Sequence, residues 1–159
     1  MSSKRIPKGR NSVTPYLVVD DATRAIDFYK QAFGATELMR LPGPNSTVVH
    51  ADIKIGDSMI MVADQHEGSQ FRSPKAVGGS PVTLMIYVDN VDEAFKRAVS
   101  LGAKETKAVE NQFYGARAGN LVDPFGHLWT LATHVEEDLS AEEARKRWTA
   151  LQAALPKPA

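Results

Sequence analysis

One pattern of apolar and polar residues occurs twice along this chain. The stretches "VTPYLVVDDATRAIDFYKQAFGA" (residues 13–35) and "VTLMIYVDNVDEAFKRAVSLGA" (residues 82–103) share one order: a β-branched, aromatic-rich run, a capping residue, an amphipathic run and Gly-Ala. Thr14 aligns with Thr83, and further positions match at the same offset. A single repeat of this length is typical of a duplicated module, because solenoid repeats are shorter and more numerous.

Each copy predicts a strand followed by an amphipathic helix. Asn90 with Glu93 three positions later forms a variant of the capping box, and Asp21 is the expected cap of the first helix. Gly34 and Gly102 stand where a helix ends in a left-handed residue. The apolar positions recur at helical spacing: Ala25, Ile26, Tyr29, Ala32 and Phe33 in the first copy, and Val91, Ala94, Phe95, Ala98 and Val99 in the second.

Strand patterns fill the rest of each copy. The segments are "TELMRL", "TVVHADIKIG" and "MIMVAD" in the first copy, and "KETKAVE", "ARAGNLV" and "HLWTLATHV" in the second. Alternation in "TVVHADIKIG" predicts two faces, with Val49, Ala51, Ile53 and Ile55 under the helix and Val48, His50, Asp52 and Lys54 opposite. The predicted order of elements in each module is therefore strand, helix, strand, strand, strand.

The predicted fold class is α+β, with two tandem βαβββ modules forming a curved mixed sheet around a shared cavity. One helix covers only one face of its sheet, so the open faces must meet something, most simply each other. The predicted parts are a first module (12–66), an inter-module linker loop (67–81), a second module (82–137) and a C-terminal helix (138–155). A capping box at Ser140 and Glu143 predicts that helix, and its apolar line is Ala141, Ala144, Trp148 and Leu151. The length of the Gly-, Ser- and Pro-rich linker is typical of a crossover or a lid.

Composition narrows the function classes. The 159 residues carry a formal net charge of zero, so electrostatics give no argument for nucleic-acid binding. Disulfides, thiolate metal sites and cysteine nucleophiles are excluded because the chain has no cysteine. No apolar run approaches the roughly 20 residues of a membrane span. Since the start also lacks the apolar core of a secretory signal, a cytoplasmic location is expected. The basic start "SSKRIPKGR" is interpreted as a frayed terminus.

The paired modules and the phrases "VVDDATRAIDFYKQAFGA" and "DPFGHLW" resemble the vicinal-oxygen-chelate superfamily. That group includes glyoxalase I, extradiol dioxygenases, fosfomycin-resistance enzymes and bleomycin-binding proteins. The segments "HADIKIGDSMIMVAD" and "NQFYGARAGNLVDPFGHLWTLATHVEE" are similar to the PhnB-like subgroup of glyoxalase/bleomycin resistance proteins. The resemblance covers roughly residues 12–137 and is specific for fold, while one fold hosts many functions.

The resemblance also marks four positions where metal-dependent members carry histidine or glutamate. These positions lie on the first and last strand of each module and correspond here to Thr14, Met61, Thr83 and Thr130. Neither a thioether nor a neutral hydroxyl is a usual ligand of a divalent metal. We therefore expect no cofactor, and a divalent metal held by displaced ligands is the alternative.

Strand alternation assigns the residues expected on the concave surface. His50 and Asp52 share one face of their strand, and Asn120 is taken as the module-two partner of His50. His50 is interpreted either as a ligand-binding group or base, or as a structural histidine bonded to Asp52 or the backbone. Arg117 is expected to recognise an acidic group. The predicted ligand-binding set is Tyr16, His50, Asp52, Met59, Met61, Met85, Tyr87, Asn120 and Thr130, with Tyr114 and Arg117 at the rim.

The leading functional hypothesis is a metal-independent small-molecule binding protein of the glyoxalase/bleomycin-resistance type, which sequesters an antibiotic or metabolite. One alternative is a glyoxalase-like lyase or isomerase that uses His50 and Asp52 or a displaced metal site. Another is a dimerisation or regulatory module without a ligand. The expected partners are a small molecule and a second copy of the chain, module one of each beside module two of the other, with no nucleic acid and no membrane.

Overall fold

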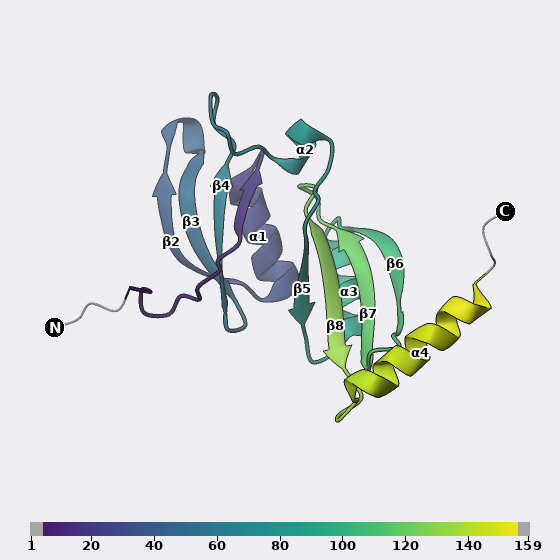
Figure 1. Cartoon of the computed structure of the whole chain (residues 1–159). Coiled ribbons are helices and arrows are strands. Elements are labelled where there is room, and N and C mark those ends of the chain that lie inside the picture. The colour runs from purple at the N-terminus through teal and green to yellow at the C-terminus, as the bar shows by residue number, and fades with distance from the viewer. Residues whose placement is uncertain (1–4, 156–159) are drawn as a thin grey trace.

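Within residues 5–155, which the computed structural model describes, the chain forms two modules of one topology and a final helix (Figure 1). Module one contains β1 (Tyr16–Val19), α1 (Ala22–Phe33), β2 (Thr36–Pro42), a 3₁₀ turn (Pro44–Ser46), β3 (Val48–Ile55) and β4 (Ser58–Asp64). After the short α2 (Pro74–Val77), module two contains β5 (Thr83–Tyr87), α3 (Val91–Ser100), β6 (Lys104–Asn111), β7 (Ala116–Val122) and β8 (Leu128–His134). The last helix is α4 (Ala141–Ala154).

The strands pair in the same way in both modules. The sheet orders are β1-β4-β3-β2 and β5-β8-β7-β6, with the first pair parallel and the others antiparallel. α1 and α3 cover the same side of the two sheets, so both sheets leave their other face open (Figure 1). The expected fold class, two tandem βαβββ modules with a C-terminal helix, is confirmed.

Short polar side chains begin the helices as their sequence predicts. Asp21 accepts a hydrogen bond from the Arg24 amide at 3.0 Å, and Asn90 accepts one from the Glu93 amide at 3.2 Å. α1 ends at Gly34 in the left-handed conformation, with φ at 68°. The boundaries of the two central helices therefore follow from local chemistry.

A side chain on the last strand of each module accepts a hydrogen bond from the first turn of the helix in that module. The buried Asp64 accepts hydrogen bonds from the amides of Ala22 at 2.7 Å and Val48 at 2.6 Å. Thr133, at the equivalent place in module two, accepts one from the Val91 amide at 2.9 Å. Each module thus fastens helix to sheet through the same position with a different side chain.

The two modules share one hydrophobic core, and a buried carboxylate joins them inside it. Asp123 Oδ2 accepts hydrogen bonds from the Tyr29 hydroxyl of module one at 2.7 Å and from the Trp129 indole at 2.9 Å. Asp123 Oδ1 accepts bonds from the amides of Phe125 at 2.9 Å and His127 at 3.0 Å. Burial, followed by the charge and hydrogen bond of Asp123, raises the pKa of Tyr29 well above its ordinary value. The phenol therefore stays protonated and donates.

We predict that Asp123→Asn lowers the free energy of unfolding by about 2–4 kcal/mol. An amide has one acceptor atom in place of two, so buried donors lose partners. Urea titration followed by tryptophan fluorescence measures the change. Tyr29→Phe, which removes one of the four bonds, is the matched control and should cost about 1 kcal/mol. Equal stability of wild type and Asp123→Asn would contradict the prediction.

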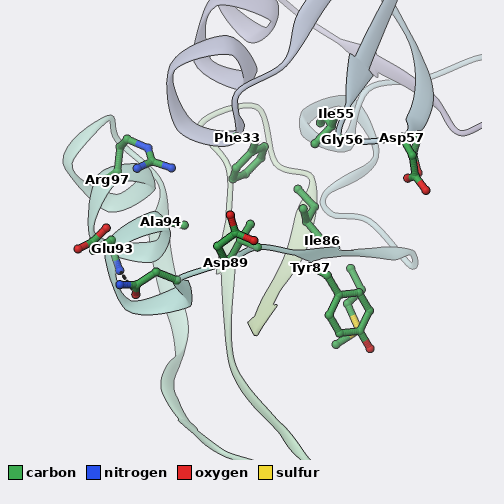
Figure 2. Close-up of a pocket in the computed structure, with 14 residues that line it drawn as sticks. Phe33, Ile55, Gly56, Asp57, Ile86, Tyr87, Asp89, Glu93, Ala94 and Arg97 are labelled. Carbon is green, nitrogen blue, oxygen red and sulfur yellow. Dashed lines mark hydrogen bonds between the residues drawn. The ribbon is translucent and has the colours of Figure 1, made fainter. Parts of the chain in front are cut away.

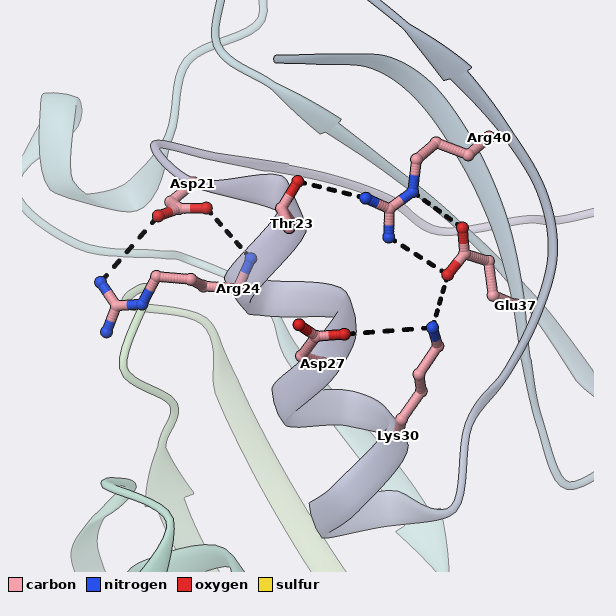
Figure 3. Close-up of polar contacts among 7 residues, drawn as sticks. All are labelled: Asp21, Thr23, Arg24, Asp27, Lys30, Glu37 and Arg40. Carbon is pink, nitrogen blue, oxygen red and sulfur yellow. Dashed lines mark hydrogen bonds and ion pairs between the residues drawn. The ribbon is translucent and has the colours of Figure 1, made fainter. Parts of the chain in front are cut away.

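A surface network of charges fastens α1 to β2 (Figure 3). Arg40 donates to Glu37 from Nε at 2.8 Å and from Nη2 at 3.1 Å, and Lys30 Nζ donates to the same carboxylate at 2.5 Å. Arg40 also donates to the Thr23 hydroxyl at 3.2 Å. The hydrogen bonds from Arg40 and then Lys30 lower the pKa of Glu37.

Because the pKa of Glu37 is lower in the folded chain, its ion pairs stabilise the fold above the unfolded pKa of about 4.3 and lose their effect as the pH falls. We predict that Glu37→Gln lowers the free energy of unfolding by about 1 kcal/mol near neutral pH. That difference should shrink as the pH drops below about 4. Urea titrations across this pH range measure it. Arg24→Gln, which removes the exposed 4.0 Å pair with Asp21 and leaves the Glu37 ion pairs in place, is the control and should change stability little. A difference that stays constant down to acidic pH would argue against the network.

One strand prediction is wrong. Val49 is 42% exposed and Val48 only 1% exposed, the reverse of the expected faces. The register between β2 and β3 shifts at this point, with Leu41 opposite His50 and Pro42 opposite Val48. This irregularity resets the alternation, and from His50 onward the faces are as expected.

Two other segments differ from expectation. The linker is not a plain loop, because Ser73 caps the helical turn α2 and Gly126 lies so near Pro74 that a β-carbon would approach it to 2.8 Å. α4 forms as predicted, yet its apolar line is not buried: Trp148 packs on Phe113 at 5.2 Å between ring centroids and stays 45% exposed.

Candidate functional site

Apart from Arg117, the structure divides the predicted ligand-binding residues between two open sheet faces. On module one, Tyr16 and Asp52 both lie opposite Met61 in the strand register, and His50 and Met59 share their face. On module two, Thr130 lies opposite both Met85 and Asn120. The register corrects one expectation, because the module-two counterpart of Asp52, and not of His50, is Asn120.

A chain of hydrogen bonds crosses the open face of module one. Tyr16 Oη lies 3.1 Å from His50 Nδ1, and His50 Nε2 lies 3.2 Å from Asp52 Oδ1. Arg10 donates from Nη2 to Asp52 Oδ2. The Asp52 carboxylate is buried while Tyr16 is 43% exposed, so the chain runs from the core to the surface.

Arg10 comes from the basic start of the chain, which the sequence did not mark as part of a site. Its Nη1 atom is buried and has no hydrogen-bond partner among residues 5–155. The ion pair places the described end of "SSKRIPKGR" on the module-one face, so Arg10 at least is not frayed; residues 1–4 lie outside the described residues.

Phe71 is a second residue that pattern reasoning missed. It belongs to the linker and its ring centroid lies 6.0 Å from that of Tyr16. Burial, and then the charge of Asp52, raise the pKa of Tyr16. The module-one face therefore combines a protonated phenol, an imidazole and a buried ion pair beside exposed aromatic rings.

The open face of module two contains a cavity of about 390 Å³. Its lining is Met85, Tyr87, Lys107, Gln112, Tyr114, Ala118, Asn120 and Thr130. The Thr130 hydroxyl donates to Asn120 Oδ1 at 3.0 Å, which leaves the Asn120 amide nitrogen as a donor. Five of the predicted residues are brought together here, and Lys107, Gln112 and Ala118 are additions from the strands and loop beside them.

The expected placement of Arg117 is wrong. Arg117 lies opposite Thr133 in the register, on the helix side of the sheet. Its guanidinium forks onto Asp92 of α3, with both nitrogen–oxygen distances at 2.8 Å, and the hydrogen bond from Arg117 lowers the pKa of Asp92. Strand alternation already predicts that Arg117 lies on the helix side, since Arg117 is odd-numbered and the open-face residues Ala118 and Asn120 are even-numbered. Arg117 therefore ties β7 to α3 and does not border the cavity.

A further cavity of about 630 Å³ lies between the modules, along β5 and the first turns of α3 (Figure 2). Phe33 and the β3–β4 turn form its module-one wall, while Glu93 and Arg97 of α3 line the opposite side. Met85 and Tyr87 contribute to this cavity as well as to the module-two cavity. β5 thus separates two hollows on the second module.

The residues at the family's metal positions do not fit a divalent metal. Thr14 precedes β1, Thr83 begins β5, and Met61 and Thr130 lie on β4 and β8. Their thioether and hydroxyl groups are poor ligands for such an ion. Across the described part of the chain, no three His, Asp or Glu side chains group so that they could hold one.

Two βαβββ modules with fused helix layers and open sheet faces define the class of this protein. The chain belongs to the Glyoxalase/Bleomycin resistance protein/Dioxygenase superfamily, whose family model matches residues 10–131. α4 lies beyond the matched residues.

Relatives of this chain share most of its length. An uncharacterized protein of Mycobacterium tuberculosis, Rv0887c, is 44% identical over 129 residues, which are 79% of this chain and 76% of the relative. The crystal structure of TioX from Micromonospora sp. ML1 is similar at 28% identity and a TM-score of 0.63, over 79% of this chain and 99% of TioX. A PhnB protein from Bacillus cereus shares the fold at 17% identity and a TM-score of 0.59, over 77% of this chain and 99% of that one. Of the helices in residues 5–155, none is long and apolar enough to cross a membrane.

Proposed function

We propose that this protein is a metal-independent small-molecule binding protein of the glyoxalase/bleomycin-resistance type. The observation that carries the proposal is the cavity of about 390 Å³ on the open face of module two. Its volume falls within the range of small-ligand sites, which combine apolar walls with a few oriented polar groups. Met85, Tyr87 and Tyr114 supply the walls, and Asn120 supplies the polar group.

The chemistry of the cavity indicates the kind of ligand. Tyrosine rings offer flat surfaces for stacking, and the unbranched side chain of Met85 adapts to varied apolar shapes. The Asn120 amide nitrogen suits a hydrogen-bond acceptor such as a carbonyl oxygen. We therefore infer that the ligand has a flat apolar part and a carbonyl-type acceptor.

The family supports the biological role that we propose. Its description includes bleomycin resistance proteins. Sequestration of an antibiotic or a metabolite requires binding but needs no catalytic metal. Assignment to the PhnB-like subgroup is part of the same proposal, since the PhnB neighbour at 17% identity supports the fold alone. The cytoplasmic location and the absence of a cofactor stay predictions from the sequence.

We predict that aromatic ketones such as 4-methylacetophenone bind the protein and that Asn120→Ala weakens this binding by about 1 kcal/mol. The variant removes one neutral hydrogen bond. Ligand-observed NMR titration measures the affinity, and native mass spectrometry of freshly purified protein reports any co-purified ligand or metal. Asn111→Ala, an exposed asparagine of the same module outside this cavity, is the matched control. Equal affinity of wild type and Asn120→Ala would count against the cavity as the ligand site.

The open faces also support the homodimer that the sequence predicts. Tyr16, Met85 and Tyr87 project from these faces and are 43%, 43% and 63% exposed. Large apolar side chains grouped on one surface favour contact with a partner surface. We propose that module one of each chain lies beside module two of its partner, which covers both faces.

The homodimer gives a test of its own. Light scattering after size-exclusion chromatography should report twice the monomer mass at micromolar concentration. Tyr87→Arg on the open face should shift the protein toward monomer, because a charge is then forced into the interface. Val77→Arg, which changes a similarly exposed residue on α2, should leave the mass unchanged. A monomeric wild type would exclude this assembly.

A second candidate function rests on the hydrogen-bond chain of module one. A hydroxyl, a histidine and a buried carboxylate in line are the groups that acid–base catalysis uses. Lyase or isomerase activity at His50 and Asp52 is therefore the alternative to simple binding.

A further inference from the structure

The hydrogen-bond chain on the module-one face has a direction, and the Arg10–Asp52 ion pair sets it. The guanidinium of Arg10 donates a hydrogen bond to Oδ2 of the buried Asp52 carboxylate, and the two groups form an ion pair. An ionised carboxylate only accepts hydrogen bonds. The bond between Asp52 Oδ1 and His50 Nε2 therefore requires the proton on Nε2.

This proton placement continues through the imidazole to Tyr16. In a neutral imidazole with its proton on Nε2, Nδ1 is an acceptor. The 3.1 Å contact between His50 Nδ1 and Tyr16 Oη is then a hydrogen bond that the phenol donates. The raised pKa of Tyr16 agrees with a phenol that keeps its proton. With that proton engaged, Tyr16 Oη presents only lone pairs to an incoming molecule.

Apolar side chains also lie beside Tyr16, next to the hydrogen-bond chain. Phe71 lies beside its ring, and in the register Met61 is opposite Tyr16 and Leu41 is opposite His50. Tyr16 also lines a cavity of about 320 Å³ at the junction of the two modules, where Leu17, Val82, Leu84 and His127 are among the other lining residues and His50 and Phe71 are not. This volume is at the lower end of the range for small-ligand sites, so it suits a molecule with one ring.

We propose that the module-one face binds a small aromatic molecule through a hydroxyl group that donates its hydrogen bond to Tyr16 Oη, with His50 and Asp52 as positioning residues. The proposal rests on the small-molecule binding function and adds a second subsite outside the module-two cavity. The two subsites have opposite polarity: Tyr16 accepts a hydrogen bond from the ligand, and Asn120 donates one. The equivalent positions of Asp52 and Asn120 carry that difference.

A conservative change at Asp52 should reverse the polarity. In Asp52→Asn the amide oxygen faces Arg10, which needs an acceptor, and the NH₂ group then faces His50 Nε2. Nε2 must accept this bond, so the imidazole proton moves to Nδ1 and Tyr16 becomes the acceptor in its bond with His50. Its hydroxyl proton turns toward the ligand. The face then prefers a ligand that accepts a hydrogen bond.

The experiment compares 4-ethylphenol with 4-ethylanisole, two probes of nearly the same shape that differ in the hydroxyl donor. Chemical-shift titration by NMR in slightly alkaline buffer gives both affinities. Wild type should bind 4-ethylphenol about tenfold more tightly, and Tyr16→Phe should bind the two probes equally. Asp52→Asn should lose the preference for 4-ethylphenol, because both probes carry an oxygen that can accept a hydrogen bond from Tyr16, provided that its circular dichroism melt shows a folded protein. If Asp52→Asn does not fold, the comparison of wild type with Tyr16→Phe tests the proposal.

Controls separate this proposal from the proposed function. Asn120→Ala should keep the preference for the phenol, because it changes the other subsite. Equal binding of the two probes by wild type, or an unchanged preference in Tyr16→Phe, overturns the module-one subsite. A preference that disappears in Asn120→Ala and persists in Tyr16→Phe also overturns it, since the phenol then occupies the module-two cavity and the proposed function stands. Retained preference for the phenol in folded Asp52→Asn overturns the positioning role.

Discussion

The buried carboxylate of Asp123 is the constraint on which the shape of this molecule depends. It lies where the "DPFG" turn of module two meets α1 of module one, and it accepts bonds from both modules. A buried carboxylate is tolerated only when donors surround it, so the turn, the Trp129 indole and the Tyr29 hydroxyl must be in place together. His127 adds a second link across the same junction, 3.0 Å from the Val18 carbonyl. The helix layers are fused by these contacts, and both open sheet faces are left on the other side.

The fold could be predicted from the sequence because its helices and strands depend mainly on local chemistry. Caps at Asp21 and Asn90, helical stripes and strand alternation determine elements that depend mainly on their own residues, and these were predicted correctly. Errors arose where distant contacts decide. The irregularity opposite Pro42 reverses Val48 and Val49, and no period-two pattern reveals it.

The candidate site was predictable to the same degree. Alternation assigned Tyr16, Asp52, Met85 and Asn120 to open faces, because these positions follow from strand parity. Arg117 was assigned by its chemistry and not by its parity, and its partner Asp92 lies on the helix side. Arg10 and Phe71 were missed because they come from segments outside the strands. Such segments carry no periodic signal, and only the folded chain brings them to the face.

The ion pair of Arg10 bears on how independent each duplicated unit is. Arg10 precedes β1, so the cation that neutralises Asp52 comes from outside the repeated βαβββ unit. Excised without this segment, the first unit would keep a buried carboxylate with no counter-ion, a costly arrangement. The second unit carries the neutral Asn120 at the equivalent position and has no such need. Of the two repeated units, the first therefore depends on its flanking peptide at this position, and the second does not.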